Sequence, residues 1–259
     1  MKNIFVLTLL CCMTYVSYSQ NNSDNNDKPN PTWELDLAPY IWIANLSADV
    51  SFLEQSVHVK AKFKDVLKNL KMGALIHAEV KKGKWFIMGD LVYLKVAKDG
   101  NIDALSIDTR LEIKQTVAEL GAGYNLINSQ DWLFIDGFAG FRYFSIINKI
   151  EAGSQDLLDK TINTTDPFFG VRFRTVSDNW INSARVDVGG FGIGSEISWK
   201  ANILIGYKFS DLFALYMGFQ GYGIDYEKDD FGLDLTSAGF VTGFNFHFQK
   251  THLYEIYNN

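Results

Sequence analysis

Charged side chains at every second position of several segments are the best candidates for functional residues in this sequence. They lie opposite the apolar face of segments with period-two alternation, and acids dominate the earlier segments while bases dominate the later ones. Facing inward in a closed barrel, they could form either an ion-pair network or a narrow, selective or proton-linked pore. We favour the network, because a barrel near this size fills most of its interior with side chains. The predicted network comprises Glu34, Asp36, Glu79, Asp90, Glu119, Asp136, Arg142, Arg172, Arg174, Arg185, Asp187 and Lys200.

Histidine and glutamate side chains could also bind a metal ion. His77 and Glu79 lie two positions apart on one predicted strand face, which would provide half of a site. The other histidines fall on a loop, a distant strand and the C-terminal tail, at His58, His247 and His252. Their spacing indicates no third ligand, so we expect no metal site.

Catalytic arrangements have little support in the sequence. No Gly-x-Ser-x-Gly elbow occurs, and no serine and histidine are placed for nucleophilic catalysis. Asp90 and Glu119 could act as an acid–base pair, but the arginines of the same predicted interior are their better explanation. The glycine-rich run at 189–194 lies between two predicted strands and opens no helix, so we interpret it as a tight external turn and not as a nucleotide-binding loop. The sequence therefore predicts no enzyme and no cofactor.

The N-terminus has the features of a secretory signal peptide. Lys2 precedes an apolar run at 4–13 that is too short to span a bilayer, and small residues lie three and one positions before Gln20. We expect cleavage there, so that residues 1–19 are removed. The next segment, 20–31, is polar and poor in apolar side chains, which is typical of a disordered leader.

Cleavage would also decide the cysteine content and the charge. Cys11 and Cys12 are the only cysteines, and both would leave with the signal peptide. Neither follows a glycine, alanine or serine, which disfavours lipidation. The mature chain would then have no disulfide or thiolate site. Its formal charge would be −7, one below the −6 of the whole chain because Lys2 is lost, and this argues against nucleic-acid binding.

Residues 32–248 are predicted to form one all-β domain, a closed antiparallel transmembrane β-barrel, followed by a tail at 249–259. Alternating apolar positions bounded by turn residues define about ten strands, with eight or twelve also possible. The predicted strands cover 33–43, 72–82, 84–97, 104–126, 131–145, 166–177, 180–191, 197–209, 212–225 and 233–248.

The lengths of the connections favour a membrane barrel over a soluble one. Tight joins near 82–83, 128–129, 177–178 and 210–211 alternate with longer ones at 44–71, 98–103, 146–165, 192–196 and 226–232. Outer-membrane barrels have short turns at one end and longer external loops at the other. An even strand count places both chain ends at the short-turn end. Within the first long connection we expect a small external hairpin and a short helix.

Aromatic side chains cluster beside the tight turns, as in an interfacial girdle. They are Trp33, Trp85, Tyr124, Trp132, Trp180, Tyr207, Phe209, Phe213 and Phe248. The apolar face continues around nearly all strands, while the opposite faces are rich in glycine and charge, which suits a crowded interior. We therefore expect the apolar face to point outward into lipid.

Several motifs resemble those of a broad group of uncharacterised bacterial outer-membrane β-barrel proteins. They are PYIW at 39–42, KGKW at 82–85, DPFFGVR at 166–172, RVDVGGFGIGS at 185–195 and GYKFS at 206–210. The resemblance covers most of the mature chain and departs from the group at 219–223 and in the C-terminal tail. It implies an outer-membrane barrel and carries no assigned activity.

From these observations we expect a non-enzymatic outer-membrane protein, either a narrow pore or a structural envelope barrel with external loops. One alternative is a surface-binding or adhesion module that acts through loops 44–71 and 146–165. Others are a membrane-embedded hydrolase and a soluble secreted ligand-binding barrel. The expected partners are outer-membrane lipid and the barrel-assembly machinery. The partner of the external loops is left open.

Overall fold

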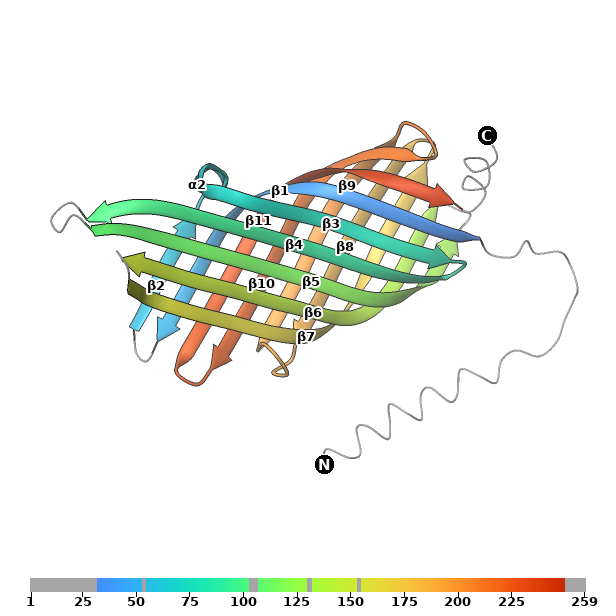
Figure 1. The fold of residues 1–259 in the computed structure, drawn as a ribbon. Coiled ribbons are helices and arrows are strands. Elements are labelled where there is room, and N and C mark those ends of the chain that lie inside the picture. The colour runs from blue at the N-terminus through green and yellow to red at the C-terminus, as the bar shows by residue number, and fades with distance from the viewer. Residues whose placement is uncertain (1–31, 53–54, 103–106, 130–131, 153–154, 250–259) are drawn as a thin grey trace, which may run out of the picture. The chain divides into compact units, whose positions relative to one another are not determined.

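The computed structural model describes residues 32–249, except 53–54, 103–106, 130–131 and 153–154 (Figure 1). The predicted signal peptide, the leader and the tail after Gln249 lie outside the described residues. Within the described part, no helix is both long and apolar enough to cross a membrane. The elements are β1 (Trp33–Phe52), β2 (Gln55–Ala61), α2 (Phe63–Asn69), β3 (Leu70–Lys82), β4 (Trp85–Ile102), β5 (Ile107–Ser129), β6 (Leu133–Ala152), β7 (Gln155–Ser177), β8 (Trp180–Gly190), β9 (Ile197–Lys208), β10 (Phe213–Lys228) and β11 (Phe231–Gln249).

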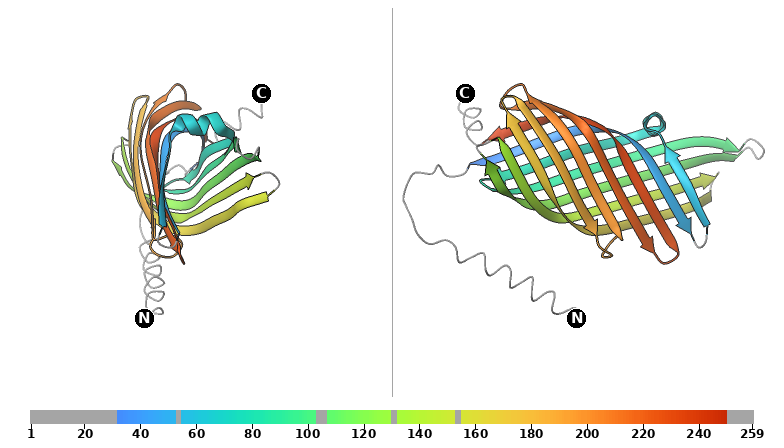
Figure 2. Two further views of the ribbon diagram at one scale, coloured as in Figure 1. Left: turned by 90° about the vertical axis from the view of Figure 1, so that its left-hand side faces the viewer. Right: turned by 180° about the vertical axis from the view of Figure 1, so that it is seen from behind.

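Ten of these strands close into an antiparallel barrel, which confirms the predicted fold class. From β3 to β11 each strand pairs with the next one along the chain, and β1 pairs with both β3 and β11. The closing seam extends from Glu34 opposite Gln249 to Phe52 opposite Phe231. Because the ring closes, its wall leaves no long edge free for aggregation. Both ends of the described chain lie at the end of the barrel that carries the tight turns, hereafter the turn end (Figures 1 and 2).

The segment after β1 forms the expected hairpin and helix. β2 pairs with the last part of β1, from Leu46 opposite Ala61 to Phe52 opposite Gln55. β3 pairs with the first part of β1, as far as Pro39 opposite Ile76. α2 joins the two strands and contacts both β1 and β4. The hairpin thus extends the wall at the far end of the barrel as an eleventh strand.

The longest connections expected from the sequence are mostly strand. Residues 146–165, predicted as a loop, continue the β6–β7 ladder from Ile146 opposite Ile162 to Ala152 opposite Gln155. The predicted loop 98–103 is likewise largely β4, and 226–232 is largely β10 and β11. Polar residues such as Asn163 face outward there, so the apolar alternation fades although the backbone pairing continues. The connection at 192–196 remains a loop.

The barrel is apolar outside and polar inside. Large apolar side chains on its outer surface are well exposed, including Leu120, Phe141, Ile203 and Phe219. The buried polar and charged residues lie at the alternate positions of the same strands, pointing inward. A water-soluble barrel has the reverse arrangement, so the outward apolar face predicted from the sequence is confirmed.

Aromatic side chains gather on the outer surface at the turn end. Trp180, Tyr207, Phe209 and Phe213 form a continuous series of ring contacts, with centroids 5.0–5.7 Å apart. Trp85 packs edge-on against Tyr124 further around the barrel, at 4.8 Å. These residues lie beside the tight turns, as the girdle prediction requires.

Candidate functional site

A layer of fully paired charges crosses the middle of the lumen. Arg142 on β6 donates from Nε to Glu119 Oε1 at 2.8 Å and from Nη2 to Asp187. Arg185 on β8 donates from Nη2 to Glu119 Oε2 at 2.9 Å and from Nε to Asp187 Oδ2 at 2.8 Å. All four side chains are almost completely buried. Each carboxylate therefore faces two guanidinium groups, which offsets the cost of removing these charges from water.

Lys200 extends this layer to the opposite wall. Its Nζ lies 3.3 Å from Glu119 Oε2 and 3.4 Å from Asp90 Oδ1. Asp90 also accepts a hydrogen bond of 2.9 Å from the hydroxyl of Tyr40 and lies 3.3 Å from His77 Nδ1. Lys200 is on β9 and Asp90 on β4, and four strands lie between β4 and β9 in either direction around the ten-strand ring. The ion pairs therefore cross the lumen from wall to wall.

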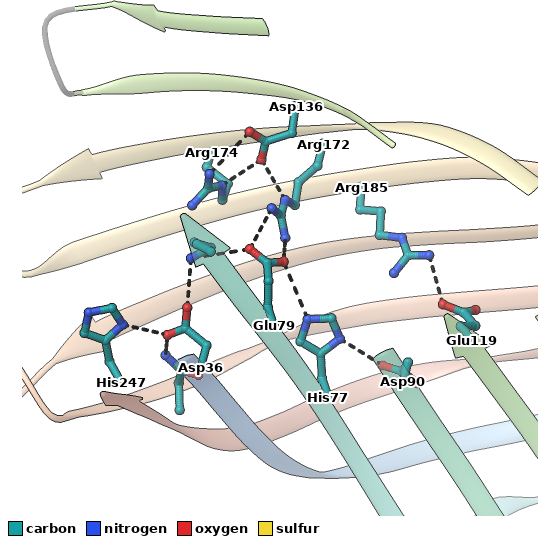
Figure 3. Close-up of polar contacts among 12 residues, drawn as sticks. Asp36, His77, Glu79, Asp90, Glu119, Asp136, Arg172, Arg174, Arg185 and His247 are labelled. Atoms are coloured by element: carbon teal, nitrogen blue, oxygen red, sulfur yellow. Dashed lines mark hydrogen bonds and ion pairs between the residues drawn. The ribbon is translucent and has the colours of Figure 1, made fainter. Parts of the chain in front are cut away.

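A second cluster of charges lies closer to the turn end (Figure 3). Arg172 on β7 binds both carboxylate oxygens of Glu79 on β3, with Nη2 3.1 Å from Oε1. Its Nε donates to Asp136 at 2.9 Å, and Arg174 donates to the same oxygen at 3.0 Å. Asp136 is fully buried and also accepts from Asn125 at 2.8 Å. The carboxylate of Asp136 thus accepts hydrogen bonds from both arginines of β7.

Asp36 on β1 is the centre of a third cluster. Its carboxylate accepts from Lys81 and lies within hydrogen-bond distance of Asn245 and His247, at 2.8–2.9 Å. None of these three partners was in the predicted network. Asn245 and His247 lie on β11, which only the closure of the barrel brings beside β1, and Lys81 lies on β3, two positions after Glu79 on the same inward face. The structure thus brings eleven of the twelve predicted residues into ion pairs. Glu34 is the exception and makes no ion pair with a described residue.

Asp166 on β7 is a fully buried carboxylate that the sequence analysis did not single out. It accepts from the backbone N of Ser195 at 2.8 Å and from its hydroxyl at 2.7 Å. It thereby holds the glycine-rich turn, in which Gly190, Phe191 and Gly192 have φ between 56° and 92°. This confirms the tight turn that was predicted for 189–194.

Apolar side chains fill the lumen on the far side of the charged layer. Phe144 on β6 stacks on Tyr222 on β10 at 6.4 Å, and Ile162, Ile224 and Leu235 are buried around them. This cluster joins strands from opposite sides of the ring. A smaller apolar cluster lies on the β4–β7 side of the turn-end half, where the lumen arginines pack over its rings. It consists of Phe86, Met88, Phe138 and Phe168.

The remaining turn-end half of the lumen is a cavity of about 640 Å³, hereafter the vestibule. Tyr40, Asp90, Lys200 and Gln220 are among its lining residues, and Asp90 and Lys200 also belong to the charged layer. Lys208, Asp211 and Gln249 line it where the β9–β10 turn and the end of β11 lie. The vestibule thus reaches the turn end, whereas the charged layer and the apolar core lie between it and the far end.

The pair His77 and Glu79 is engaged within the barrel. His77 Nε2 lies 3.9 Å from Glu79 Oε2, and its Nδ1 faces Asp90. In the part of the chain that the structure describes, no group of three or more acidic, histidine or cysteine side chains is placed to hold a metal ion. The imidazole bridges two carboxylates of neighbouring strands.

No family model and no curated protein sequence matches the chain. Solved structures of outer-membrane β-barrel proteins are similar to it at low identity. Ail, the attachment invasion locus protein of Yersinia pestis, is 10% identical with a TM-score of 0.36, over 84% of this chain and 99% of that one. Neisserial surface protein A is 13% identical with a TM-score of 0.31, over 83% and 97%. The translocator domain of the autotransporter NalP of Neisseria meningitidis is 9% identical with a TM-score of 0.35, over 95% and 96%.

Proposed function

We propose that this chain is a non-enzymatic β-barrel of a bacterial outer membrane that is closed to ion flow. The observation that carries the proposal is the charged layer that crosses the lumen from β9 to β4, with the apolar core beyond it. Its assembly by the barrel-assembly machinery and its membership of the group whose motifs it resembles belong to the same proposal.

The outer surface supports the membrane placement. On β6 the outward positions from Leu133 to Tyr143 are apolar or small, and on β7 they are apolar from Phe173 to Pro167, with the polar Thr175 and Thr165 on either side. A tilted strand needs about 9–11 residues to cross a bilayer, which fits this band. The aromatic girdle lies at the turn end of the band, where interfacial tryptophan and tyrosine are expected. The paired strands beyond the band would then stand outside the membrane.

The filled lumen argues against the narrow pore that the sequence left open. An ion that entered from the vestibule would meet Arg142 and Arg185, both already bound to two carboxylates. Beyond them it would meet the Phe144–Tyr222 stack and the buried apolar side chains around it, which cannot replace the hydration shell of an ion. Conduction would require both barriers to rearrange together.

Single-channel recording in planar bilayers tests this proposal. We expect the unmodified protein to give no discrete conductance steps over a range of salt concentrations and voltages. A variant that combines Arg142→Ala, Phe144→Ala and Tyr222→Ala should give steps, because it removes side chains from both barriers. Phe141→Ala is the matched control, because Phe141 neighbours Arg142 in sequence but faces outward. Regular steps from the unmodified protein would refute the closed barrel.

A further inference from the structure

A short, exposed helix that joins β2 to β3 protrudes from the barrel wall (Figures 1 and 2). This helix, α2, contains no buried residue. Phe63 and Val66 are half-buried and lie on one side of it, which therefore faces the wall. Lys64 and Lys68 are exposed on the other side, so the helix directs its positive charge away from the barrel.

Neighbouring acids do not balance the positive charge of this segment. Residues 62–71 contain four lysines, since Lys62 and Lys71 flank the helix, and one acidic residue, Asp65. All four lysines are exposed, and none forms an ion pair with a residue that the structure describes. A partner from outside the chain can therefore reach them.

Two more lysines extend this basic surface over β4 and β5. Lys95 lies directly opposite Lys114, and one carboxylate holds them together, with Glu112 Oε2 3.1 Å from Lys95 Nζ and Oε1 3.0 Å from Lys114 Nζ. Lys95 also lies opposite Met72 of β3, and α2 contacts β4. The helix and the two strands thus share one surface, hereafter the basic patch, formed by Lys62, Lys64, Lys68, Lys71, Lys95 and Lys114.

The basic patch lies at the far edge of the apolar band. On β1 the outward residues Ile41 and Ile43 are exposed, and the next outward residue is the polar Asn45. Asn45 Oδ1 accepts a hydrogen bond of 3.1 Å from the backbone N of Phe63, which fixes the start of α2 at this level. On β4, counted from the turn end, Lys95 is likewise the first charged outward residue. The patch therefore lies where lipid head groups would follow the acyl chains.

Apolar side chains are exposed beside these lysines. Leu67 of α2 and Met72 of β3 are 56% and 57% exposed. A segment that exposes both apolar and lysine side chains is suited to a membrane interface, because the apolar groups enter the acyl region while the ammonium groups reach the head groups. Leu67 and Met72 thus continue the apolar band up to the basic patch.

We propose that the basic patch binds the phosphate groups of anionic lipids in the leaflet at the far end of the barrel. Each lysine near a membrane surface strengthens the binding of anionic lipid by a factor of about five. The whole chain has a formal charge of −6, so this attraction comes from the local cluster and not from the net charge. The inference rests on the proposed membrane placement and adds a class of lipid to it.

Native mass spectrometry of the full protein in a non-ionic detergent tests the proposal. Phosphatidylglycerol and phosphatidylcholine with the same acyl chains compete for the protein in equal amounts. Retained phosphatidylglycerol should exceed retained phosphatidylcholine about tenfold, because only phosphatidylglycerol has a net negative charge. Equal retention of the two lipids would overturn the proposal.

Vesicles of phosphatidylcholine alone test the membrane placement separately. The barrel should insert into them and resist protease, since the apolar band requires no anionic lipid. Failure to insert would contradict the proposed function on which this inference rests. Insertion together with equal retention of the two lipids would overturn the lipid-binding inference alone.

Charge variants locate the binding surface. The triple variant Lys62→Gln, Lys64→Gln and Lys68→Gln should lose most of the preference for phosphatidylglycerol. The matched control replaces three lysines of the turn end by glutamine; they are Lys82, Lys84 and Lys208, of which the first two lie over the rings of Trp33 and Tyr124. This control should keep the preference, and both variants should still insert into phosphatidylcholine vesicles. Equal losses in the two triple variants would contradict the assignment, because they would indicate an effect of net charge.

Discussion

Arg142 is fully buried and binds carboxylates on two strands, β5 and β8. Its guanidinium also lies over the rings of Phe168 and Tyr222, at 5.0 and 5.4 Å. The flat, forked shape of the group lets one side chain satisfy both carboxylates in a confined space. Glycine provides part of that space: a Cβ at Gly170 would lie 2.5 Å from the Cβ of Asp187. The central layer thus depends on the guanidinium group of Arg142 and on the space left by the missing side chain of Gly170.

Arg142→Met should lower the free energy of unfolding by about 3–5 kcal/mol, because it leaves Glu119 and Asp187 buried with fewer partners. Urea unfolding in lipid vesicles, followed by tryptophan fluorescence, would measure this loss. Arg174→Met is the matched control; its side chain is 23% exposed and its carboxylate keeps Arg172, so the loss should be clearly smaller. Equal losses in the two variants would show that the central layer contributes no more to the free energy of unfolding than the cluster around Asp136.

At the scale of elements, β1, β11 and β10 bring three carboxylates into one row beyond the apolar band. Asp49 lies directly opposite Asp234, which lies directly opposite Asp225. Partial burial, and next the charges of Asp234 and Glu227, raise the pKa of Asp225. Like charges directly opposite each other on neighbouring strands are destabilising. The row is thus a weak point of the wall at its far end; among the described residues, His58 relieves it by contacting Asp49 at 2.6 Å.

Asp234→Asn should therefore stabilise the barrel by about 0.5 kcal/mol at pH 7. A carboxyl group with a raised pKa stabilises the folded state as pH falls through that pKa, so the benefit of the variant should be smaller at acidic pH, below the raised pKa of Asp225, than at pH 7. Thermal melts at the two pH values would measure the difference. Asp178→Asn, at an exposed tight turn, should change little. A loss of stability in Asp234→Asn at pH 7 would show that the row has a stabilising partner.

The strands also show which parts of the fold and of the lumen contacts could be predicted from the sequence. Alternation located all ten wall strands and their inward faces, because burial in lipid on one side imposes a strict period of two. Alternation missed the strand extensions at 146–165. The outer face of these extensions lies outside lipid, so apolar residues no longer occupy every second position there. The partners Lys81, Asn245 and His247 of Asp36 were missed for another reason. Which inward side chains meet depends on the stagger of the strands around the ring, which no single segment encodes.

At the scale of the whole molecule, the charges divide into buried and exposed sets. The lumen pairs join walls that are far apart in the chain, such as Arg172 with Glu79, and lie away from bulk water. Pairs such as Lys208 with Asp211 lie at the surface. Salt screens exposed charges far more than buried ones. The fold is thus held together across its interior by interactions that the surrounding ions reach poorly.

Raising KCl from about 0.1 M to about 1 M, which shortens the Debye length from about 10 Å to about 3 Å, should change the free energy of unfolding of the unmodified barrel only slightly. The advantage of Asp234→Asn should largely disappear over the same range, because the repulsion that it removes is exposed. Urea unfolding at the two salt concentrations would measure both effects. A large salt-dependent loss in the unmodified protein would show that water and ions penetrate the central layer.

The seam between β1 and β11 is the pairing that closes the ring. In the ten-strand ring, every other pairing joins strands that follow one another along the chain, with only the β2 hairpin intervening between β1 and β3. Without the 19-residue strand β11, a sheet of the other strands in this order would have two unpaired edges, at β10 and at β1. We therefore expect a chain that lacks β11 to associate with other strands through these unpaired edges. The pairing of β11 with β1 is thus the step that removes both unpaired edges and closes the barrel.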